Sequence, residues 1–195
     1  VTEALIRVVP LPDTRWLRGL AFPDLDAAWA FMRDVMQAEL WPSVLRLYDP
    51  IDTRIGGPAR GAAKEAAGRN GKGWFDKVRR LVEAAPALRR HLLEVPLALP
   101  RLVNRISAGL GDEVLVILGF EGPQAVVDAV VAAAEPLWAG ARDLGAAPGE
   151  YWFRHRHDVS YKLAPVFAAG GWADTMEVAS TWSALPALHE KVRAG

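Results

Sequence analysis

The chain contains no cysteine among its 195 residues. This absence excludes disulfide bonds, thiolate catalysis and cysteine-ligated metal, and it leaves the cellular compartment undecided. Net charge is absent too, because 23 basic side chains balance 23 acidic ones. A neutral chain has no general electrostatic attraction to nucleic acid or to an anionic membrane, so neither is expected as a partner.

Long apolar runs are also missing. The longest candidates, 114–120 and 125–134, are shorter than the roughly 18 to 20 residues that cross a bilayer, so no membrane span is expected. Nothing reads as a signal peptide, and a cytoplasmic location is the expectation. The sequence lacks a nucleoside-triphosphatase phosphate loop, a Gly-x-Gly-x-x-Gly fingerprint and a Gly-x-Ser-x-Gly elbow. Its chemistry must therefore be sought in less standard patterns.

The composition that remains, 51% hydrophobic and 24% charged, is that of a globular domain. Asp24 is predicted to cap one helix, and Pro123 to begin another whose buried stripe is Val126, Val127, Val130, Val131 and Ala134. A short helix is predicted near the end of the chain. Strands are predicted at 5–9, 16–22, 43–48, 113–120 and 172–180, and the nearly continuous apolar run at 113–120 is expected of a strand covered on both faces. The strand–helix–strand order occurs twice around a helical insertion at 55–110. This order predicts an α+β fold, a ferredoxin-like antiparallel sheet with helices on one face.

The insertion divides into two compositions. Residues 55–73 are rich in Gly, Ala and charge, which is typical of an inserted or mobile loop. Residues 74–106 show short helical patterns broken by prolines and carrying several arginines. A solvated helix face explains this basic region, and a docking surface for a partner or another domain is the alternative.

Residues 149–162 hold the densest chemistry of the chain, with cations, imidazoles and aromatic rings side by side. This pattern predicts a pocket wall that holds an anionic, partly apolar ligand. The alternative is a charged edge strand beside Trp152 and Phe153.

The candidate residues of this segment follow from their chemistry. Fixed cations such as Arg156 and Lys162 orient a carboxylate or phosphate through charge-assisted hydrogen bonds. An imidazole near its ordinary pKa moves protons at neutral pH, which makes His155 and His157 candidate catalytic groups. The two imidazoles share a face on a strand and diverge on a helix. No His-x-x-x-His pair accompanies them, so no metal site is expected.

Four stretches together resemble the C-terminal, substrate-side domain of FAD-linked oxidases of the vanillyl-alcohol-oxidase type. Residues 1–10 resemble the strand that closes the flavin-binding domain, and 19–28 resemble the first strand and helix of the cap. Residues 43–49 resemble the family's Arg-Leu-x-Asp strand. Residues 175–182 resemble the Glu-Thr-x-x-x-Trp segment of alkyldihydroxyacetonephosphate synthases and related bacterial oxidoreductases.

The resemblance implies a two-domain flavoprotein with FAD as its cofactor. Residues 1–12 would end a flavin-binding domain, and 13–195 would form the substrate-side cap. The missing N-terminal domain would hold most of the FAD, so the isolated chain is expected to be inactive. A homodimer is a further possible assembly.

The resemblance also suggests roles for individual residues. Arg46, on the Arg-Leu-x-Asp strand, would face the flavin or a substrate anion, and a salt bridge to Asp49 or a neighbouring acid is the alternative. Thr2 and Glu3 match the flavin-domain junction and would contact the cofactor through their backbone. Tyr161 matches a tyrosine that precedes the Glu-Thr-x-x-x-Trp segment and is a third catalytic candidate.

One position departs from the synthase branch. That branch often carries an arginine two residues after the tyrosine, and here the position is Leu163, with Lys162 beside it. The expected function is therefore the cap of an FAD-dependent oxidoreductase acting on a small hydroxylated, anionic substrate. Alkylglycerone-phosphate synthesis, with no net redox turnover, is one alternative. A non-catalytic ferredoxin-like ligand-binding domain is the other.

Overall fold

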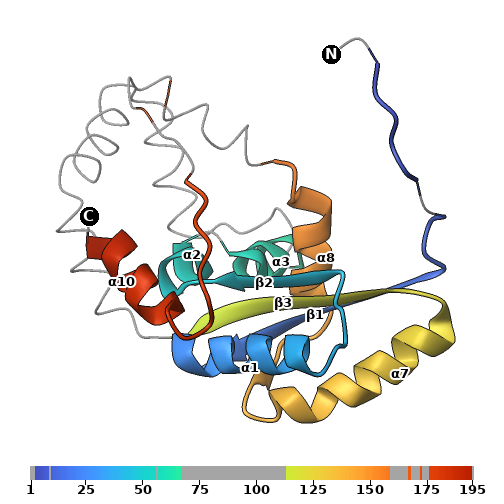
Figure 1. Ribbon diagram of the computed structural model, residues 1–195, viewed down its shortest axis with the longest axis horizontal. Coiled ribbons are helices and arrows are strands. Elements are labelled where there is room, and N and C mark those ends of the chain that lie inside the picture. Colours follow the sequence, from blue (N-terminus) through green and yellow to red (C-terminus); the bar gives the residue numbers. More distant parts are fainter. Residues whose placement is uncertain are drawn as a thin grey trace.

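A computed structural model of the protein describes residues 3–8, 10–55, 57–66, 113–158, 167, 172 and 176–194 (Figure 1). The elements follow one another as β1 (Thr14–Phe22), α1 (Leu25–Gln37), β2 (Val44–Tyr48), α2 (Pro50–Ile55), α3 (Pro58–Ala66), β3 (Val114–Gly122), α7 (Gln124–Ala134), the 3₁₀ helix η1 (Glu135–Trp138), β4 (Arg142–Asp143), α8 (Ala147–His155) and α10 (Leu185–Ala194). Most of the predicted insertion at 55–110 lies outside the described residues, and α3 is the helix described within it.

The strands form one sheet in the order β2–β3–β1–β4, and each strand is antiparallel to its neighbours. The first strand pairs with β3 over its full length, from Thr14 opposite Gly122 to Phe22 opposite Val114. This is the order that two interleaved strand–helix–strand units produce. The predicted α+β antiparallel fold is therefore confirmed.

Local chemistry explains where the first helix begins. Asp24 has an extended backbone, and its carboxylate accepts a hydrogen bond of 2.8 Å from the Ala27 amide. This bond satisfies one of the free amides of the first turn, so Asp24 acts as the predicted N-cap. The buried residues Ala28, Phe31 and Val35 then recur at helical spacing and turn one face of α1 toward the sheet.

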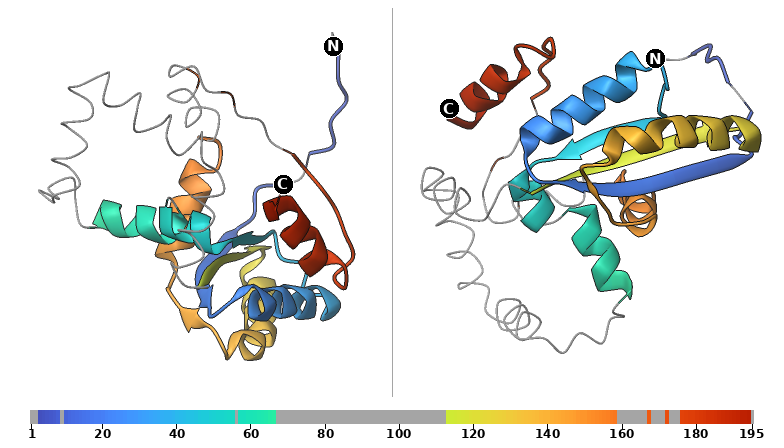
Figure 2. Two further views of the ribbon diagram at one scale, coloured as in Figure 1. Left: turned by 90° about the vertical axis from the view of Figure 1, so that its left-hand side faces the viewer. Right: turned by 90° about the horizontal axis from the view of Figure 1, so that it is seen from below.

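Helices α1 and α7 cover one face of the sheet, as Figure 2 shows from two sides. The core on this face is apolar throughout. It consists of Leu20, Phe22, Ala28, Phe31, Val35, Val114, Val116, Leu118, Phe120, Val127, Ala134 and Trp138. Burial of this surface is the main force that holds the two helices to the sheet.

A second group of helices, α2, α3 and α8, covers the opposite face of the sheet (Figures 1 and 2). Residues of β3 that face either side are fully buried, including Leu115 and Ile117 on the α8 side. The prediction that β3 is covered on both faces is therefore confirmed. The helices of the second face add a layer to the predicted arrangement.

Several predicted elements differ from the structure. Residues 5–8 form no strand, and Leu5, Ile6 and Val8 are between 75% and 104% exposed, because no described strand pairs with them. Residues 176–180 likewise form no strand. The fourth strand is instead β4, whose pairing is extended by two bonds between the loop after it and the backbone of Gly19.

The predicted buried stripe of α7 is corrected at one position. Val127 is 2% exposed and packs in the core, whereas its neighbour Val126 is 54% exposed. Adjacent helical residues point about 100° apart, so Val126 is turned away from the sheet where Val127 faces it. No helix in the described ranges is both long and apolar enough to cross a membrane.

Candidate functional site

The first half of the aromatic and basic segment forms helix α8, so the charged-edge-strand alternative is wrong for residues 149–155. This helix lies directly on β1 because Gly149 has no side chain. A Cβ atom there would stand 2.8 Å from the Leu17 Cβ and 3.2 Å from the Arg18 amide nitrogen. The close approach carries the functional groups of α8 onto the second face of the sheet.

Arg46 and Tyr48 lie on the same face as α8. Their neighbours in β2, Leu45 and Leu47, pack against the core on the α1 and α7 side, and side chains alternate along a strand. Arg46 is exposed, and its guanidinium carbon lies 5.3 Å from the centre of the Tyr48 ring. The predicted cation therefore stands beside a phenol that the sequence did not single out.

The Tyr48 hydroxyl keeps its proton in this position. Burial raises the pKa of Tyr48, while Arg46 and a hydrogen bond with Trp152 act in the opposite direction. A protonated phenol donates a hydrogen bond, and so does a guanidinium. Arg46, Tyr48 and Trp152 are called the β2 cluster below. Each of its polar groups can donate a hydrogen bond.

The alternative role for Arg46, a salt bridge to Asp49, is not seen among the described residues. The Asp49 carboxylate instead accepts a hydrogen bond of 2.8 Å from the Asp52 amide at the start of α2. This bond caps the helix. Arg46 is therefore not paired with Asp49 and lies against Tyr48 instead.

His155 joins three segments of the fold. Its Nδ1 lies 2.7 Å from the Asp158 carboxylate, and its Nε2 lies 3.1 Å from the Glu65 carboxylate at the end of α3. The hydrogen bond to Asp158, followed by that to Glu65, raises the pKa of His155. The Tyr151 ring lies 4.3 Å from the imidazole, centre to centre. Both ring nitrogens are engaged, so catalysis by His155 needs one of these bonds to open.

Arg156 turns back onto its own helix. Its guanidinium donates a hydrogen bond to the Phe153 carbonyl and lies 3.8 Å from the centre of the Phe153 ring. Arg15 of β1 lies over the same ring, at 3.7 Å. Cations over an aromatic face are stabilised by its negative charge distribution. The ring thus joins α8 to β1.

The remaining predicted residues are less closely placed. His157 is exposed just beyond α8, and Glu3 is exposed in a stretch without regular structure. Thr2, Tyr161 and Lys162 lie outside the described residues. Among the residues that are described, no group of three or more acidic, histidine or cysteine side chains is placed to hold a metal ion.

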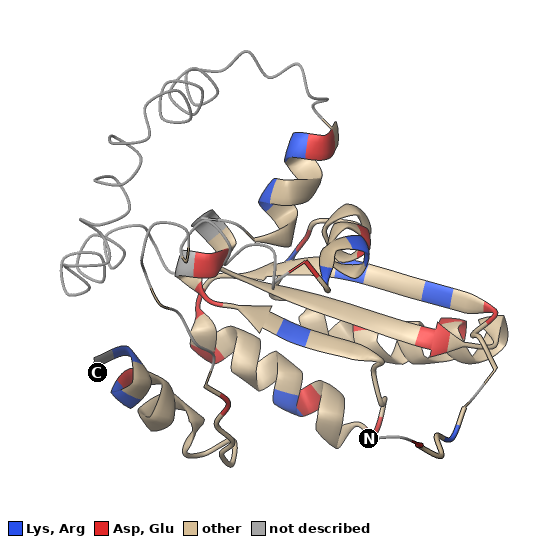
Figure 3. Ribbon diagram, turned by 90° about the horizontal axis from the view of Figure 1, so that it is seen from above, with Lys and Arg blue, Asp and Glu red and all other residues tan. Residues whose placement is uncertain are grey.

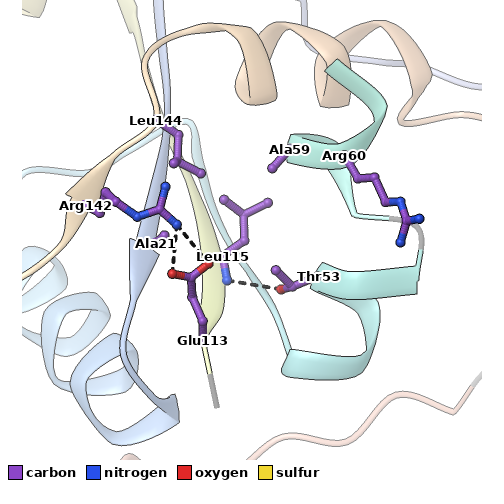
Figure 4. Close-up of a pocket in the computed structure, with 8 residues that line it drawn as sticks. All are labelled: Ala21, Thr53, Ala59, Arg60, Glu113, Leu115, Arg142 and Leu144. Carbon is purple, nitrogen blue, oxygen red and sulfur yellow. Dashed lines mark hydrogen bonds and ion pairs between the residues drawn. The ribbon is translucent and has the colours of Figure 1, made fainter. Parts of the chain in front are cut away.

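Two cavities formed by described residues border β1. The smaller, about 300 Å³, lies between β1, β3, β4, α2 and α3 (Figure 4). Its walls are mainly apolar, and Arg142 forms a two-pronged pair with Glu113 at 2.8 and 2.9 Å. In Figure 4 the Arg60 side chain points away from the cavity. The paired charges leave this cavity without an evident polar anchor for a ligand.

The larger cavity, about 450 Å³, lies between β1 and α8 and is called the β1–α8 pocket below. It is lined by Arg15, Trp16, Leu17, Arg18, Ala146, Glu150, Phe153 and Arg154. None of Arg15, Arg18 and Glu150 was predicted as a site residue from the sequence. The two arginines that interrupt the apolar β1 pattern are the signal that could have revealed them.

Charge is distributed without a single dominant sign. Figure 3 shows basic and acidic positions interspersed over the described helices and strands. Anion binding therefore depends on local clusters rather than on an overall field.

The residues present fit only part of FAD. The β2 cluster offers donors and aromatic surface, which suit a ring carbonyl or a substrate anion. Pyrophosphate sites need backbone amides at a glycine-rich helix start. Helices α7 and α8 begin after Pro123 and Ala146, and neither start is glycine-rich; α3 begins after Gly57, but its first residue is Pro58, which has no amide hydrogen to donate.

Known proteins resemble this chain over nearly its whole length. The family described as FAD linked oxidases, C-terminal domain, matches residues 11–195. Alkyldihydroxyacetonephosphate synthase of Dictyostelium discoideum is 25% identical over 99% of this chain and 28% of its own length. The enzyme of the same name from Trypanosoma brucei brucei is 25% identical over 97% of this chain and 27% of its own length.

Solved structures agree with this result. Two structures of alkyldihydroxyacetonephosphate synthase, in P212121 and P1, share the fold with TM-scores of 0.62 and 0.63. Their identities are 21% and 22%, and each match covers 93% of this chain and 29% of the other. The chain thus spans less than a third of the length of these relatives. It belongs to the family of FAD-linked oxidase C-terminal domains.

Proposed function

We propose that the chain is the substrate-side cap of an FAD-dependent oxidoreductase, and that Arg46 binds the anionic end of a small hydroxylated substrate. The observation that carries this proposal is the β2 cluster. Arg46 is exposed, makes no ion pair with a described acid, and stands beside the protonated Tyr48 hydroxyl. The family match begins at residue 11, which supports a division into 1–12 and a cap at 13–195.

The β2 cluster would bind and orient the substrate. A guanidinium forms strong, directional hydrogen bonds to a carboxylate or phosphate. The Tyr48 phenol adds a second donor, and the Trp152 ring adds an apolar wall. FAD held by the preceding domain would supply the hydride-accepting chemistry that amino-acid side chains lack. Holding the substrate in one orientation is the contribution expected of this chain.

A second candidate function is alkylglycerone-phosphate synthesis. The relatives named alkyldihydroxyacetonephosphate synthase, aligned over 97% and 99% of the chain, favour it. In that case Arg46 would hold a phosphate, and the reaction would proceed without net redox turnover. Leu163, in place of the arginine common in that branch, argues for the oxidoreductase.

The test uses the intact protein that contains this chain. Anaerobic addition of 2-hydroxy acids should reduce the bound flavin, and Arg46→Gln should lower kcat/KM by about 10- to 100-fold, as expected for one charged hydrogen bond. Arg46→Lys should recover part of the activity because it keeps the charge. Arg33→Gln is the matched control, since Arg33 lies on α1 and pairs with Asp34.

Three results would count against the proposal. Wild-type kinetics in Arg46→Gln would remove Arg46 from the site. Exchange of an acyl for an alkyl chain on a phosphate substrate, without flavin reduction, would favour the synthase. A stoichiometric FAD complex of the isolated chain would contradict the domain division.

A further inference from the structure

The β1–α8 pocket and the β2 cluster are adjacent at α8, where the Trp152 ring of the cluster lies 6.5 Å from the Phe153 ring of the pocket, but they have different polar residues. Arg15, Trp16, Leu17 and Arg18 of β1 form one side of it, and β3 separates β1 from β2 in the sheet. Its residues have no role in the function proposed above. Three guanidinium groups and one carboxylate line it, so its polar lining is mainly cationic.

Arg18 has the longest ion pair of the three pocket arginines. Its Nε is buried and has no hydrogen-bond partner in the described structure. Arg18 forms an ion pair with Asp143, whose oxygen lies 3.5 Å from this Nε, beyond the usual length of a hydrogen bond, and the Arg18 side chain as a whole is 34% exposed. Buried donors are nearly always satisfied, so an unpaired one calls for a functional explanation. A guanidinium carries five donors in a fork that matches a carboxylate or phosphate.

The other two arginines are already engaged. Arg15 donates to Glu121 and covers the Phe153 ring. Arg154 donates to Glu65 at 2.7 Å. These pairs fix both guanidinium groups at the pocket wall, so they contribute positive charge while Arg18 has donors to offer. This division makes Arg18 the expected anchor.

The pocket also has a rigid apolar wall. The Trp16 ring stacks on Trp138, with centres 5.8 Å apart, and lies 6.0 Å from Phe120. The guanidinium carbon of Arg18 lies 5.3 Å from the Trp16 ring centre. A ligand that places its charge at Arg18 would therefore rest its apolar body against the neighbouring Trp16 ring. Stacked rings of this kind pre-form the site, which favours binding.

We propose that the β1–α8 pocket is a second ligand site, in which Arg18 anchors the carboxylate or phosphate group of a small molecule with an aromatic or apolar body. Glu150 lines the same pocket and can accept a hydrogen bond from a ligand hydroxyl. Its negative charge disfavours ligands with several anionic groups. The site thus selects a single oxyanion attached to a flat or aliphatic group.

The experiment is a fluorine NMR titration of the intact protein with 4-fluorobenzoate. The titration is carried out in the Arg46→Gln background, so that the β2 cluster does not contribute. The uncharged 4-fluorobenzamide is the comparison ligand, and 4-fluorophenyl phosphate tests the alternative oxyanion. We expect saturable line broadening by at least one oxyanion probe and weaker binding of the amide.

Substitution of Arg18 should remove the preference for the oxyanion. In Arg46→Gln/Arg18→Gln, affinity for the oxyanion should fall about 10- to 100-fold, to the level of the amide. Arg18→Lys should keep part of the preference because it keeps the charge. Arg33→Gln should bind as the background protein does. Thermal unfolding of each variant shows whether the fold is intact, and an unchanged midpoint excludes a merely structural effect.

Two outcomes would overturn the proposal. One is no saturable binding of either oxyanion probe to the Arg46→Gln protein. The other is equal affinity with and without Arg18. Neither outcome affects the function proposed for the β2 cluster, because that function is tested by turnover of the Arg46 variants alone.

Discussion

The two faces of the sheet are built on different principles. The face toward α1 and α7 is filled by apolar side chains, and Leu20, Val35 and Leu118 are among those that are fully buried. The face toward α8 contains glycines in close contact, stacked rings and ion pairs such as Arg154–Glu65. The face toward α1 and α7 stabilises the fold by burying apolar side chains. The second holds functional groups in fixed positions through close backbone approach and hydrogen bonding.

The largest expected effect comes from the apolar face. Leu118 of β3 is fully buried in the core, so Leu118→Ala should lower the free energy of unfolding by about 2–5 kcal/mol. Hydrogen–deuterium exchange of the β3 amides in the intact protein measures this loss. Val126→Ala is the control, because Val126 is 54% exposed and should change stability by no more than about 0.5 kcal/mol. Equal effects of the two substitutions would contradict the assigned core.

An intermediate effect is expected where α8 meets β1. A methyl group at Gly149 would meet the Leu17 side chain and the backbone of β1, so Gly149→Ala should cost about 1–3 kcal/mol. It should also open the β1–α8 pocket, which hydrogen exchange of the β1 and α8 amides would detect. Gly140→Ala is the matched control, since a Cβ there has nothing within 4 Å. Unchanged exchange in Gly149→Ala would show that α8 moves away from β1 without cost.

The apolar face could be predicted from the sequence because its signals are local. A continuous apolar run gave β3, and an aspartate before a helical pattern gave α1. The second face depends on contacts between distant residues. One of the two partners of His155 is Glu65, 90 positions earlier, and no local pattern links them. The two residues of β4 are likewise too few for a strand pattern, and they pair because a turn returns the chain to β1.

The candidate site divides in the same way. Arg46 could be placed on an exposed strand, because β2 alternates and the family motif marks the position. Residues 149–155 were expected as a pocket wall, but their spacing did not show a helix, since polar and aromatic positions recur without an apolar stripe. Arg18 was missed because its significance depends on an unpaired buried atom, which only the tertiary structure reveals. Burial and satisfaction of polar groups are properties of the fold rather than of the sequence alone.

The smallest expected effect is the pH dependence of the His155–Glu65 interaction, which links α8 to α3. Hydrogen bonds to Asp158 and Glu65 raise the pKa of His155, and the bond from His155, with Arg154, lowers the pKa of Glu65. A raised histidine pKa stabilises the fold fully below its ordinary value of about 6.5, and the effect is lost as the pH rises through the raised value. A lowered carboxylate pKa contributes above its ordinary value near 4.5 and is lost as the pH falls. The His155–Glu65 interaction should therefore stabilise the fold most between about pH 4.5 and pH 6.5.

Two measurements test this dependence in the intact protein. NMR titration of the His155 ring should give a pKa above the ordinary histidine value. Exchange of the α3 amides, compared after correction for intrinsic rates, should show more opening at pH 9 than at pH 6. His155→Gln should remove most of that difference, whereas His157→Gln, an exposed neighbour, should keep it. Since His155 is about a third exposed, water screens its ion pairs and the effect stays modest. An imidazole that titrates at or below its ordinary value would show that the α8 face is held by packing at Gly149 and Tyr151 rather than by these charges.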